Sequence, residues 1–290
     1  MAYIFNSLEI DVDWQAPTLT RALDQWLDED LGRGDLSAAA LQGRQGQAHW
    51  IAKQAGRFCG GPLVRRLFQR LDGEVQVRLL IEDGAAIAEG DRLLELLGPA
   101  AALVAGERTA LNLAMRLSGI ATATAALVAD LEGSSVQLAD TRKTTPGLRV
   151  LEKYAVRCGG GVNHRMGLDD AAMLKENHIA WAGGITAAIQ AVRQRSPWPA
   201  LVIVEAETEA QASEAVQAGA DGVLLDEFTP EQLVELVPRL RHQSPAGVVL
   251  EASGVQPEQL RAYAATGIDL ISTSAPVTRS RWLDLSMRFS

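Results

Sequence analysis

Four apolar runs at regular spacing in the C-terminal half constrain the fold of this chain most. They are LVIVEAE (201–207), GVLLDE (222–227), GVVLEASG (247–254) and DLISTSA (269–275). Equivalent positions in successive runs (Glu205, Asp226, Glu251 and Thr273) are 21, 25 and 22 residues apart. Segments with helical patterns fill the intervals. A step of this length fits one strand and one helix, and continuous apolar strands indicate a parallel sheet buried on both faces.

Together with SVQLAD (135–140), the series predicts an α/β fold with a (β/α) barrel. A doubly wound sheet is the alternative, but no G-x-G-x-x-G sequence follows a strand near the start of the series. The first hundred residues differ, because short alternating runs there are broken by Asp-Gly and Glu-Gly and flanked by helical patterns. This predicts an antiparallel sheet with helices. We place the boundary near residue 118, with an N-terminal domain at 1–118 and the barrel at 119–276.

Composition limits the class of protein. The chain has 290 residues, 47% of them hydrophobic, and a formal net charge of −9, so it can bury a large core and lacks the broad basic face of a nucleic-acid-binding protein. Its two cysteines indicate no disulfide framework. We find neither an apolar stretch of membrane-spanning length nor a secretory signal, and we expect a cytoplasmic protein that binds neither membrane nor nucleic acid.

Positive charge is concentrated in one segment of this acidic chain. Three of its four lysines (Lys143, Lys153 and Lys175) lie between residues 143 and 175, close to several arginines and two histidines. A local cationic field favours a small anionic ligand. The alternative is a set of solvated helix faces, and Lys153 with Arg157, four residues apart, fits that alternative.

Four carboxylates each come at the end of a strand-like run, at Asp140, Glu205, Asp226 and Glu251. The C-terminal ends of barrel strands carry the chemistry in barrel enzymes, so these positions are candidate site residues. Each carboxylate taken alone could equally be a helix cap or a loop charge.

The segment ADTRKTTPGLRVLEKYAVRCGGGVNHRMGL (139–168), followed by LKENHI (174–179), closely resembles the quinolinate phosphoribosyltransferase family. Further matching segments are EDLGRGDLS (29–37), GERTALNLAMRLSGIATAT (106–124), VEAET (204–208), LLDEF (224–228), EASG (251–254) and DLSMRF (284–289). The resemblance therefore covers nearly the whole chain.

The resemblance implies an N-terminal α/β sandwich domain and an open barrel of about seven strands, with the C-terminal tail (277–290) packed on the N-terminal domain. It implies a homodimer with shared active sites, or a hexamer. The implied reaction transfers phosphoribosyl from phosphoribosyl pyrophosphate to quinolinate with loss of carbon dioxide, in de novo NAD biosynthesis. Mg²⁺ is the implied cofactor.

The resemblance also implies roles for individual residues. Arg142, His164 and Arg165 bind the quinolinate carboxylates, and Arg108 reaches in from the neighbouring subunit. Lys143 and Lys175 lie near the phosphates and the reacting ring. Glu205 and Asp226 hold the ribose hydroxyls, directly or through Mg²⁺ and water. Ser253 and Gly254 bind the 5′-phosphate, helped by the next helix N-terminus. His178 is either a structural hydrogen-bond partner or a substrate contact.

One position departs from the family pattern. Ser274 in ISTSAP stands where the family commonly has Gly, which narrows the approach of a phosphate to the backbone, although the hydroxyls of Ser272, Thr273 and Ser274 can bind phosphate instead. Three alternative functions remain. The first two are a related protein of the molybdenum-transport type and a nicotinate phosphoribosyltransferase. The third is a carrier module, because IEDGAAIAEGD (81–91) resembles biotinyl and lipoyl domains. The carrier lacks a lysine to modify between Lys53 and Lys143.

Overall fold

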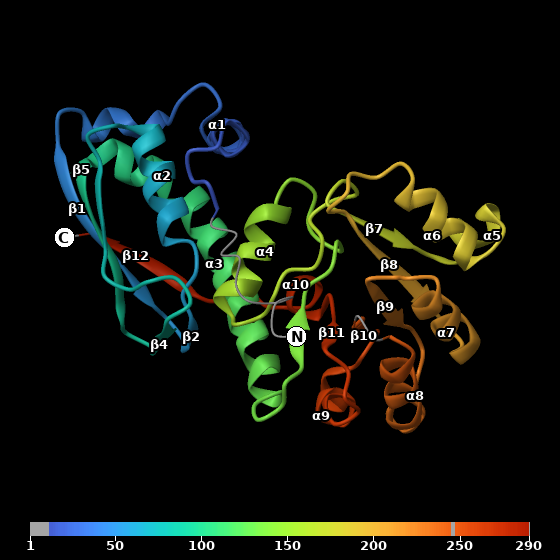
Figure 1. The fold of residues 1–290 in the computed structure, drawn as a ribbon. Coiled ribbons are helices and arrows are strands. Elements are labelled where there is room, and N and C mark those ends of the chain that lie inside the picture. Colours follow the sequence, from blue (N-terminus) through green and yellow to red (C-terminus); the bar gives the residue numbers. More distant parts are fainter. Residues whose placement is uncertain (1–11, 245–246, 290) are drawn as a thin grey trace. The chain divides into compact units, whose positions relative to one another are not determined.

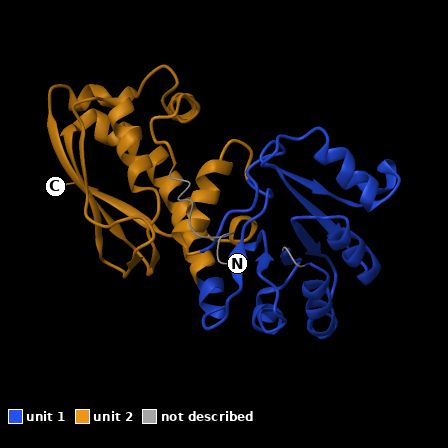
Figure 2. Cartoon of the chain, viewed as in Figure 1, with its two compact units in different colours: residues 1–8, 126–144, 161–275 blue, residues 9–125, 145–160, 276–290 orange. Residues whose placement is uncertain are grey.

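The computed structural model describes residues 12–244 and 247–289. The chain forms two compact units that alternate along the sequence (Figure 2). The described part of unit 1 comprises residues 126–144 and 161–275, and that of unit 2 comprises 12–125, 145–160 and 276–289. The domains that we predicted at 1–118 and 119–276 are continuous segments, whereas each unit combines segments distant in sequence. The predicted domain limits therefore stay a prediction.

Unit 1 contains a six-stranded parallel sheet. Its strands are β6 (Gln137–Ala139), β7 (Ala171–Leu174), β8 (Leu201–Ala206), β9 (Gly222–Leu225), β10 (Val249–Ser253) and β11 (Leu270–Ser272). The spatial order is β6-β11-β10-β9-β8-β7, with every neighbouring pair parallel. The last strand therefore lies beside the first, which is the neighbour relation of a closing barrel.

The edge of β6 carries one more extended segment. Ala139 forms a parallel bridge with Val162, whose backbone N–H donates to Leu138 at 2.8 Å. The sheet thus gains a seventh short segment next to β6, and no pairing joins that segment to β7 among the described residues. An open, barrel-like sheet confirms the predicted fold class, and the doubly wound alternative is excluded because β11 pairs with β6.

Helices connect the strands of unit 1 and cover one face of the sheet (Figure 1). They are α5 (Glu176–Ala182), α6 (Ile185–Arg193), α7 (Glu209–Gln217), α8 (Pro230–Gln243), the short 3-10 turn η2 (Pro257–Gln259) and α9 (Leu260–Ala264). Thr208 and Thr229 open α7 and α8 with capping boxes, in which a glutamine three residues later returns a hydrogen bond. The capping residues in the sequence therefore determine where α7 and α8 begin.

Unit 2 is built on an antiparallel sheet of order β12-β1-β5-β3. Its strands are β1 (Gln45–Ala52), β3 (Gln76–Leu79), β5 (Arg92–Pro99) and β12 (Leu285–Phe289), and β2 (Gly56–Arg57) pairs with β4 (Ala86–Ile87). Its helices are α1 (Pro17–Leu31), the 3-10 helix η1 (Leu36–Leu41), α2 (Gly61–Leu71) and α4 (Arg149–Cys158). Most of α3 (Ala100–Asp130) and α10 (Ala275–Thr278) also belongs to this unit, whereas residues 126–130 and Ala275 belong to unit 1. The antiparallel sheet predicted for the first hundred residues is confirmed.

Helix α3 packs in the core of unit 2. Its residues Leu103, Ala110, Ala114 and Leu117 are at most 1% exposed. By length and composition alone, α3 could also cross a membrane, which differs from the sequence analysis, where we found no apolar stretch of that length. Half of its most apolar 18-residue segment is buried inside the protein. Burial of this kind is what a core helix shows.

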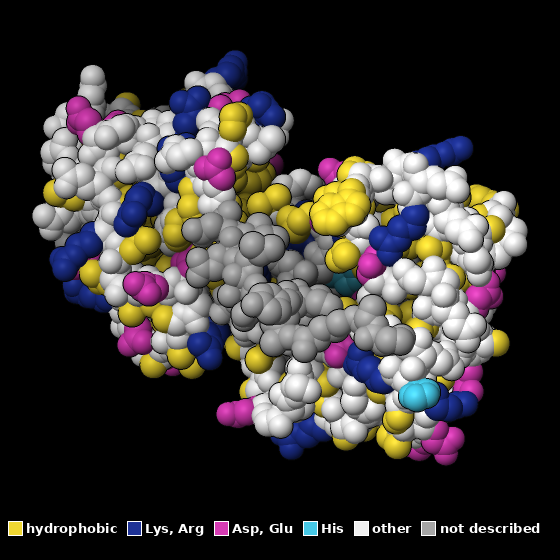
Figure 3. All heavy atoms as spheres, in the orientation of Figure 1, with side chains coloured by type: hydrophobic (Ala, Val, Ile, Leu, Met, Phe, Trp, Pro, Cys, Tyr) yellow, Lys and Arg dark blue, Asp and Glu magenta, His cyan; other side chains and the backbone are white. Residues whose placement is uncertain are grey.

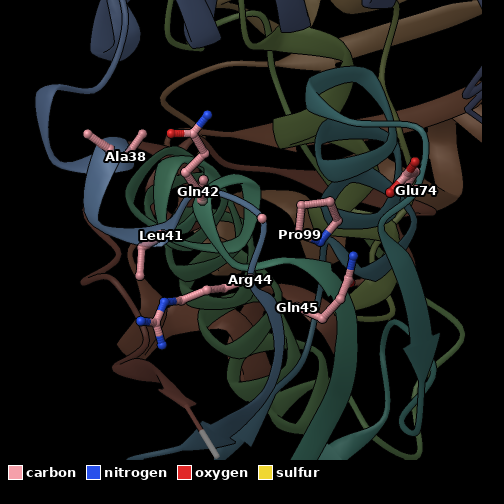
Figure 4. A pocket seen from close by; sticks show the side chains of 10 residues that line it. Ala38, Leu41, Gln42, Arg44, Gln45, Glu74 and Pro99 are labelled. Atoms are coloured by element: carbon pink, nitrogen blue, oxygen red, sulfur yellow. The ribbon is translucent and has the colours of Figure 1, made fainter.

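A cavity of about 530 Å³ lies in unit 2 beside η1, the start of β1 and the end of β5 (Figure 4). Gln42, Arg44, Gln45 and Glu74 give it its polar groups. None of the predicted site residues lines this cavity.

Candidate active site

The two faces of the unit 1 sheet differ in chemistry. Val204, Leu225 and Leu250 belong to the apolar cluster formed with the helices. Because side chains alternate along a strand, the residues next to them point to the other face. That opposite face carries Glu205, Glu251, Ser253 and Ser272 among its apolar residues. Glu251 and Ser272 are buried, whereas Glu205 and Ser253 are half-buried. This face is a candidate site, since burying polar groups costs free energy unless they form hydrogen bonds.

Lys175 and Glu205 meet at the carboxyl ends of β7 and β8. Leu174 pairs with Val204, so the next residue on each strand occupies the same level of the sheet. The Lys175 Nζ forms an ion pair with Glu205 Oε2, and the Lys175 side chain is half exposed. Its backbone N–H donates to His178 Nδ1 at 3.0 Å, which makes His178 a structural partner of Lys175. Lys175 is thus anchored at its base and accessible at its ammonium group.

Asp226 and Ser253 form an equivalent pair at the ends of β9 and β10. Leu225 pairs with Ala252, and the Ser253 hydroxyl donates to Asp226 Oδ1. Gly254 follows with φ +70° and open space around its missing Cβ. The helix expected after Gly254 begins as the three-residue 3-10 turn η2, which continues directly into α9. Backbone N–H groups and hydroxyls are the hydrogen-bond donors available here.

Two arginines lie near each other in unit 1. Arg165 Nη1 donates to the Ala171 carbonyl at 2.9 Å. Burial, and after it the positive charge of Arg142, lowers the pKa of Arg165, while Asp170 acts in the opposite direction. The Arg142 Nε is buried and has no hydrogen-bond partner among the described residues. An anion bound here would satisfy this donor and relieve the repulsion between two guanidinium groups.

His164 lies between two buried carboxylates. Its backbone N–H donates to Asp140 Oδ1 at 2.9 Å, and its Nε2 is 3.1 Å from Glu251 Oε2. The Arg165 backbone N–H donates to its Nδ1 at 2.7 Å. Both ring nitrogens therefore have protein partners, so binding a substrate carboxylate directly would require one of these bonds to open.

The remaining predicted residues are spread more widely. Lys143 follows Arg142 and is exposed. Ser272 is buried and pairs in register with Ser253, and Ser274 follows two residues later. Arg108 belongs to unit 2, where it is exposed on α3 and outside the unit 1 set. On the face shown in Figure 3, described Lys and Arg side chains are interspersed with Asp and Glu.

Sequence reasoning noted two further residues without giving them a role. Asp140 and Glu251 are 2% and 3% exposed, yet Asp140 accepts a hydrogen bond from the His164 backbone N–H and Glu251 Oε2 lies 3.1 Å from His164 Nε2. Their signal in the sequence was a carboxylate at the end of a strand-like run, although the structure places Glu251 in the middle of β10. The partner could not be read from the sequence, because Glu251 lies 87 residues from His164.

Glu205 and Asp226 are the candidate metal ligands. Mg²⁺ prefers carboxylate oxygens and retained waters, and both residues offer such oxygens at the ends of neighbouring strands. Their donor chemistry fits that ion. Each carboxylate already has a protein partner, Lys175 or Ser253, which shares its charge.

The open barrel and the polar ends of its strands define an enzyme of the α/β-barrel class. The chain belongs to the quinolinate phosphoribosyltransferase family. The family models described as "Quinolinate phosphoribosyl transferase, N-terminal domain" and "C-terminal domain" match residues 35–118 and 120–288.

Individual relatives agree with this assignment. A probable carboxylating nicotinate-nucleotide pyrophosphorylase of Synechocystis is 46% identical, over 92% of this chain and 90% of its own. The carboxylating nicotinate-nucleotide pyrophosphorylase of Homo sapiens is 37% identical over 93% and 91%. The solved structure of the nicotinate-nucleotide pyrophosphorylase from Francisella tularensis has a TM-score of 0.88 and 36% identity, covering 94% of this chain and 96% of that one.

Proposed function

We propose that this protein transfers the phosphoribosyl group of phosphoribosyl pyrophosphate to the ring nitrogen of quinolinate, in de novo NAD biosynthesis. The products are nicotinate mononucleotide, carbon dioxide and pyrophosphate. Membership of the quinolinate phosphoribosyltransferase family supports this activity. The observation that carries it is the pair Arg142 and Arg165, neither of which forms an ion pair with a carboxylate among the described residues.

Quinolinate carries two carboxylates on one aromatic ring. Guanidinium groups bind planar carboxylates through two parallel hydrogen bonds, so Arg142 and Arg165 suit this substrate better than lysines would. We propose that Arg108 of a neighbouring subunit completes the binding of the dicarboxylate. His164 contributes through the hydrogen bonds that hold its ring and backbone.

The sugar phosphate requires a second set of groups. We propose that Glu205 and Asp226 bind the ribose hydroxyls and that Lys143 and Lys175 neutralise the phosphates. Ser253, Gly254, Ser272 and Ser274 provide hydroxyl and backbone N–H donors for the 5′-phosphate, in place of a strong helix dipole.

The reaction needs electrostatic stabilisation rather than a protein nucleophile. Departure of pyrophosphate leaves positive charge on the ribose, which carboxylates such as Glu205 and Asp226 favour. The ring nitrogen then forms the new C–N bond and becomes cationic. Loss of the adjacent carboxylate as carbon dioxide leaves an electron pair on the ring carbon, which takes up a proton.

We propose Mg²⁺ as the cofactor, held by Glu205 and Asp226 directly or through water. When bound, it supplies positive charge to the pyrophosphate group. Addition of EDTA should abolish turnover, and Mg²⁺ in excess of the chelator should restore it.

Released carbon dioxide tests the proposed function directly. Purified protein is incubated with carboxyl-labelled quinolinate, phosphoribosyl pyrophosphate and Mg²⁺, and labelled carbon dioxide and nicotinate mononucleotide are measured. We expect both products from quinolinate and none from nicotinate. Turnover of nicotinate would support the nicotinate phosphoribosyltransferase alternative, and no turnover of either would support the molybdenum-transport type.

We also propose a cytoplasmic homodimer with shared active sites, or a hexamer built from such dimers. Mixing subunits tests the sharing. We expect Arg108→Ala and Lys175→Ala proteins each to be inactive alone and to regain part of the activity when mixed, because one site of each mixed dimer is intact. No recovery after verified subunit exchange would contradict shared sites.

A further inference from the structure

Glu251 is a buried carboxylate that the proposed reaction does not yet use. It lies in the middle of β10, is 3% exposed, and its Oε2 is 3.1 Å from His164 Nε2. Its Oε1 is buried and finds no partner in residues 12–244 and 247–289. Burying a carboxylate with one unsatisfied oxygen costs free energy, because that oxygen gives up its hydrogen bonds to water and makes none in the protein. Such a cost indicates a functional rather than a packing role.

The hydrogen bonds of His164 determine its tautomer. A backbone N–H can only donate, so the Arg165 N–H at 2.7 Å requires an unprotonated Nδ1. The ring proton is then on Nε2 and is donated to Glu251. Glu251 therefore selects the one tautomer that lets His164 accept from the backbone of Arg165.

Asp140 fixes the main chain of the same segment. Its Oδ1 accepts from the His164 backbone N–H and its Oδ2 from the Asn163 side-chain amide, at 2.9 and 2.6 Å. Its own backbone N–H donates to Val162. Two buried carboxylates thus hold His164 from opposite ends, one through its backbone and the other through its ring.

These contacts fix the position of Arg165. Its backbone is held by His164 and its guanidinium by Ala171, close enough to Arg142 for the two charges to interact. Two guanidinium groups repel each other, so the chain must hold them together by other bonds. We propose that Glu251 and Asp140 are positioning residues that hold Arg165 beside Arg142 through the Nε2–H tautomer of His164, for binding an aromatic dicarboxylate. The choice of ligand rests on the proposed function.

Two substitutions at position 251 separate hydrogen bonding from charge. Glu251→Gln keeps an oxygen that accepts from His164 Nε2, and its KM for quinolinate should stay within about threefold of wild type. Glu251→Leu removes the acceptor, and its KM for quinolinate should rise about 10- to 100-fold, as expected for an unmade buried hydrogen bond. The KM for phosphoribosyl pyrophosphate should change less than about twofold in both, because only carboxylate binding is affected.

Controls distinguish positioning from a general structural role. Glu258→Leu makes the same change at an exposed residue of η2 and should leave both KM values unchanged. Asp140→Asn can be rescued by rotation of the Asn163 amide and should be milder than Asp140→Leu. Equal KM increases for both substrates in Glu251→Leu, or an equal loss in Glu251→Gln, would overturn the positioning role.

A spectroscopic measurement decides the tautomer without any turnover. The chain has four histidines, so ¹⁵N-labelled imidazoles can be assigned by NMR with single His→Gln variants. We expect His164 as the Nε2–H tautomer in the full-length wild-type protein and in Glu251→Gln, and a mixture in Glu251→Leu. An Nδ1–H or doubly protonated His164 in the wild type would overturn the inference. If the tautomer is as expected but quinolinate is not converted, the proposed function alone is wrong.

Discussion

Arg116 and Glu152 form an ion pair in unit 2, with 2.8 Å between Arg116 Nη2 and Glu152 Oε1. The Glu152 side chain is fully buried, and it also accepts hydrogen bonds from the backbone N–H and the hydroxyl of Thr145, both at 2.8 Å. Thr145 begins the stretch that leads into α4. The pair therefore ties α3 to the start of the α4 segment.

Removing one partner of this pair should destabilise the protein. Arg116→Met leaves Glu152 buried without its counter-ion, which costs about 3–5 kcal/mol. Urea unfolding measures the change. Arg78→Met is the matched control, because Arg78 is three-quarters exposed in its pair with Glu95 and should cost less than about 1 kcal/mol. Similar midpoints for both variants would contradict a stabilising role for the buried pair.

The raised pKa of Asp83 should make the free energy of unfolding depend on pH. Its carboxylate accepts from Gly60, Gly61 and Tyr154, yet burial outweighs these bonds and raises the pKa of Asp83 above its ordinary value. A raised pKa means that the folded protein binds this proton more tightly than the unfolded chain. The contribution to stability is therefore fully present below the unfolded pKa and is lost as pH rises through the folded pKa. Each tenfold difference in proton affinity between the two states is worth about 1.4 kcal/mol.

Asp83→Asn isolates this contribution. The variant loses an acceptor at every pH but does not titrate, so its deficit in unfolding free energy relative to wild type should shrink as pH rises from the ordinary pKa of an aspartate, about 4, through the raised pKa of folded Asp83. Urea midpoints of both proteins across this range provide the measurement. A deficit that grows with pH would mean that hydrogen bonding, and not burial, dominates at Asp83.

Gly159 should tolerate no larger residue. A Cβ there would lie 2.5 Å from the Ala121 carbonyl oxygen and 2.5 Å from Thr124 Cβ. Gly159→Ala should therefore destabilise the protein by about 1–3 kcal/mol through overpacking. Gly73→Ala is the control, since nothing lies within 4 Å of its added Cβ. Thermal unfolding compares the two, and equal melting temperatures would show that the backbone moves apart at little cost.

Arg142→Ala should lose activity without losing stability. A charge-assisted contact in a water-poor site is worth about 2–4 kcal/mol, so kcat/KM for quinolinate should fall about 30- to 1,000-fold. The melting temperature should not fall, because Arg142 has an unpartnered Nε and its charge opposes Arg165. Arg142→Lys should recover little, since an ammonium group cannot form two parallel hydrogen bonds. Near-normal kinetics in Arg142→Ala would remove it from the site.

The fold was largely predictable because its signal is periodic. Runs ending near Glu205, Asp226 and Glu251 became β8, β9 and β10, and the capping threonines Thr208 and Thr229 begin the helices that follow. The seventh extended segment at Val162 was not visible as a run, because a single bridge holds it to β6. The helix expected after Gly254 begins as a short 3-10 turn, which Pro257 could not reveal because proline suits the first turn of either kind of helix.

The sequence by itself determined which runs form strands and where the helices α7 and α8 begin, because apolar periodicity and capping residues act locally along the chain. Only the tertiary structure decided which side chains meet. Strand register places Lys175 beside Glu205 and Ser253 beside Asp226. Packing brings Glu251 to His164 across 87 residues. Hydrogen bonds act over about 3 Å, so partners distant in sequence are chosen only when the folded chain brings them within that range.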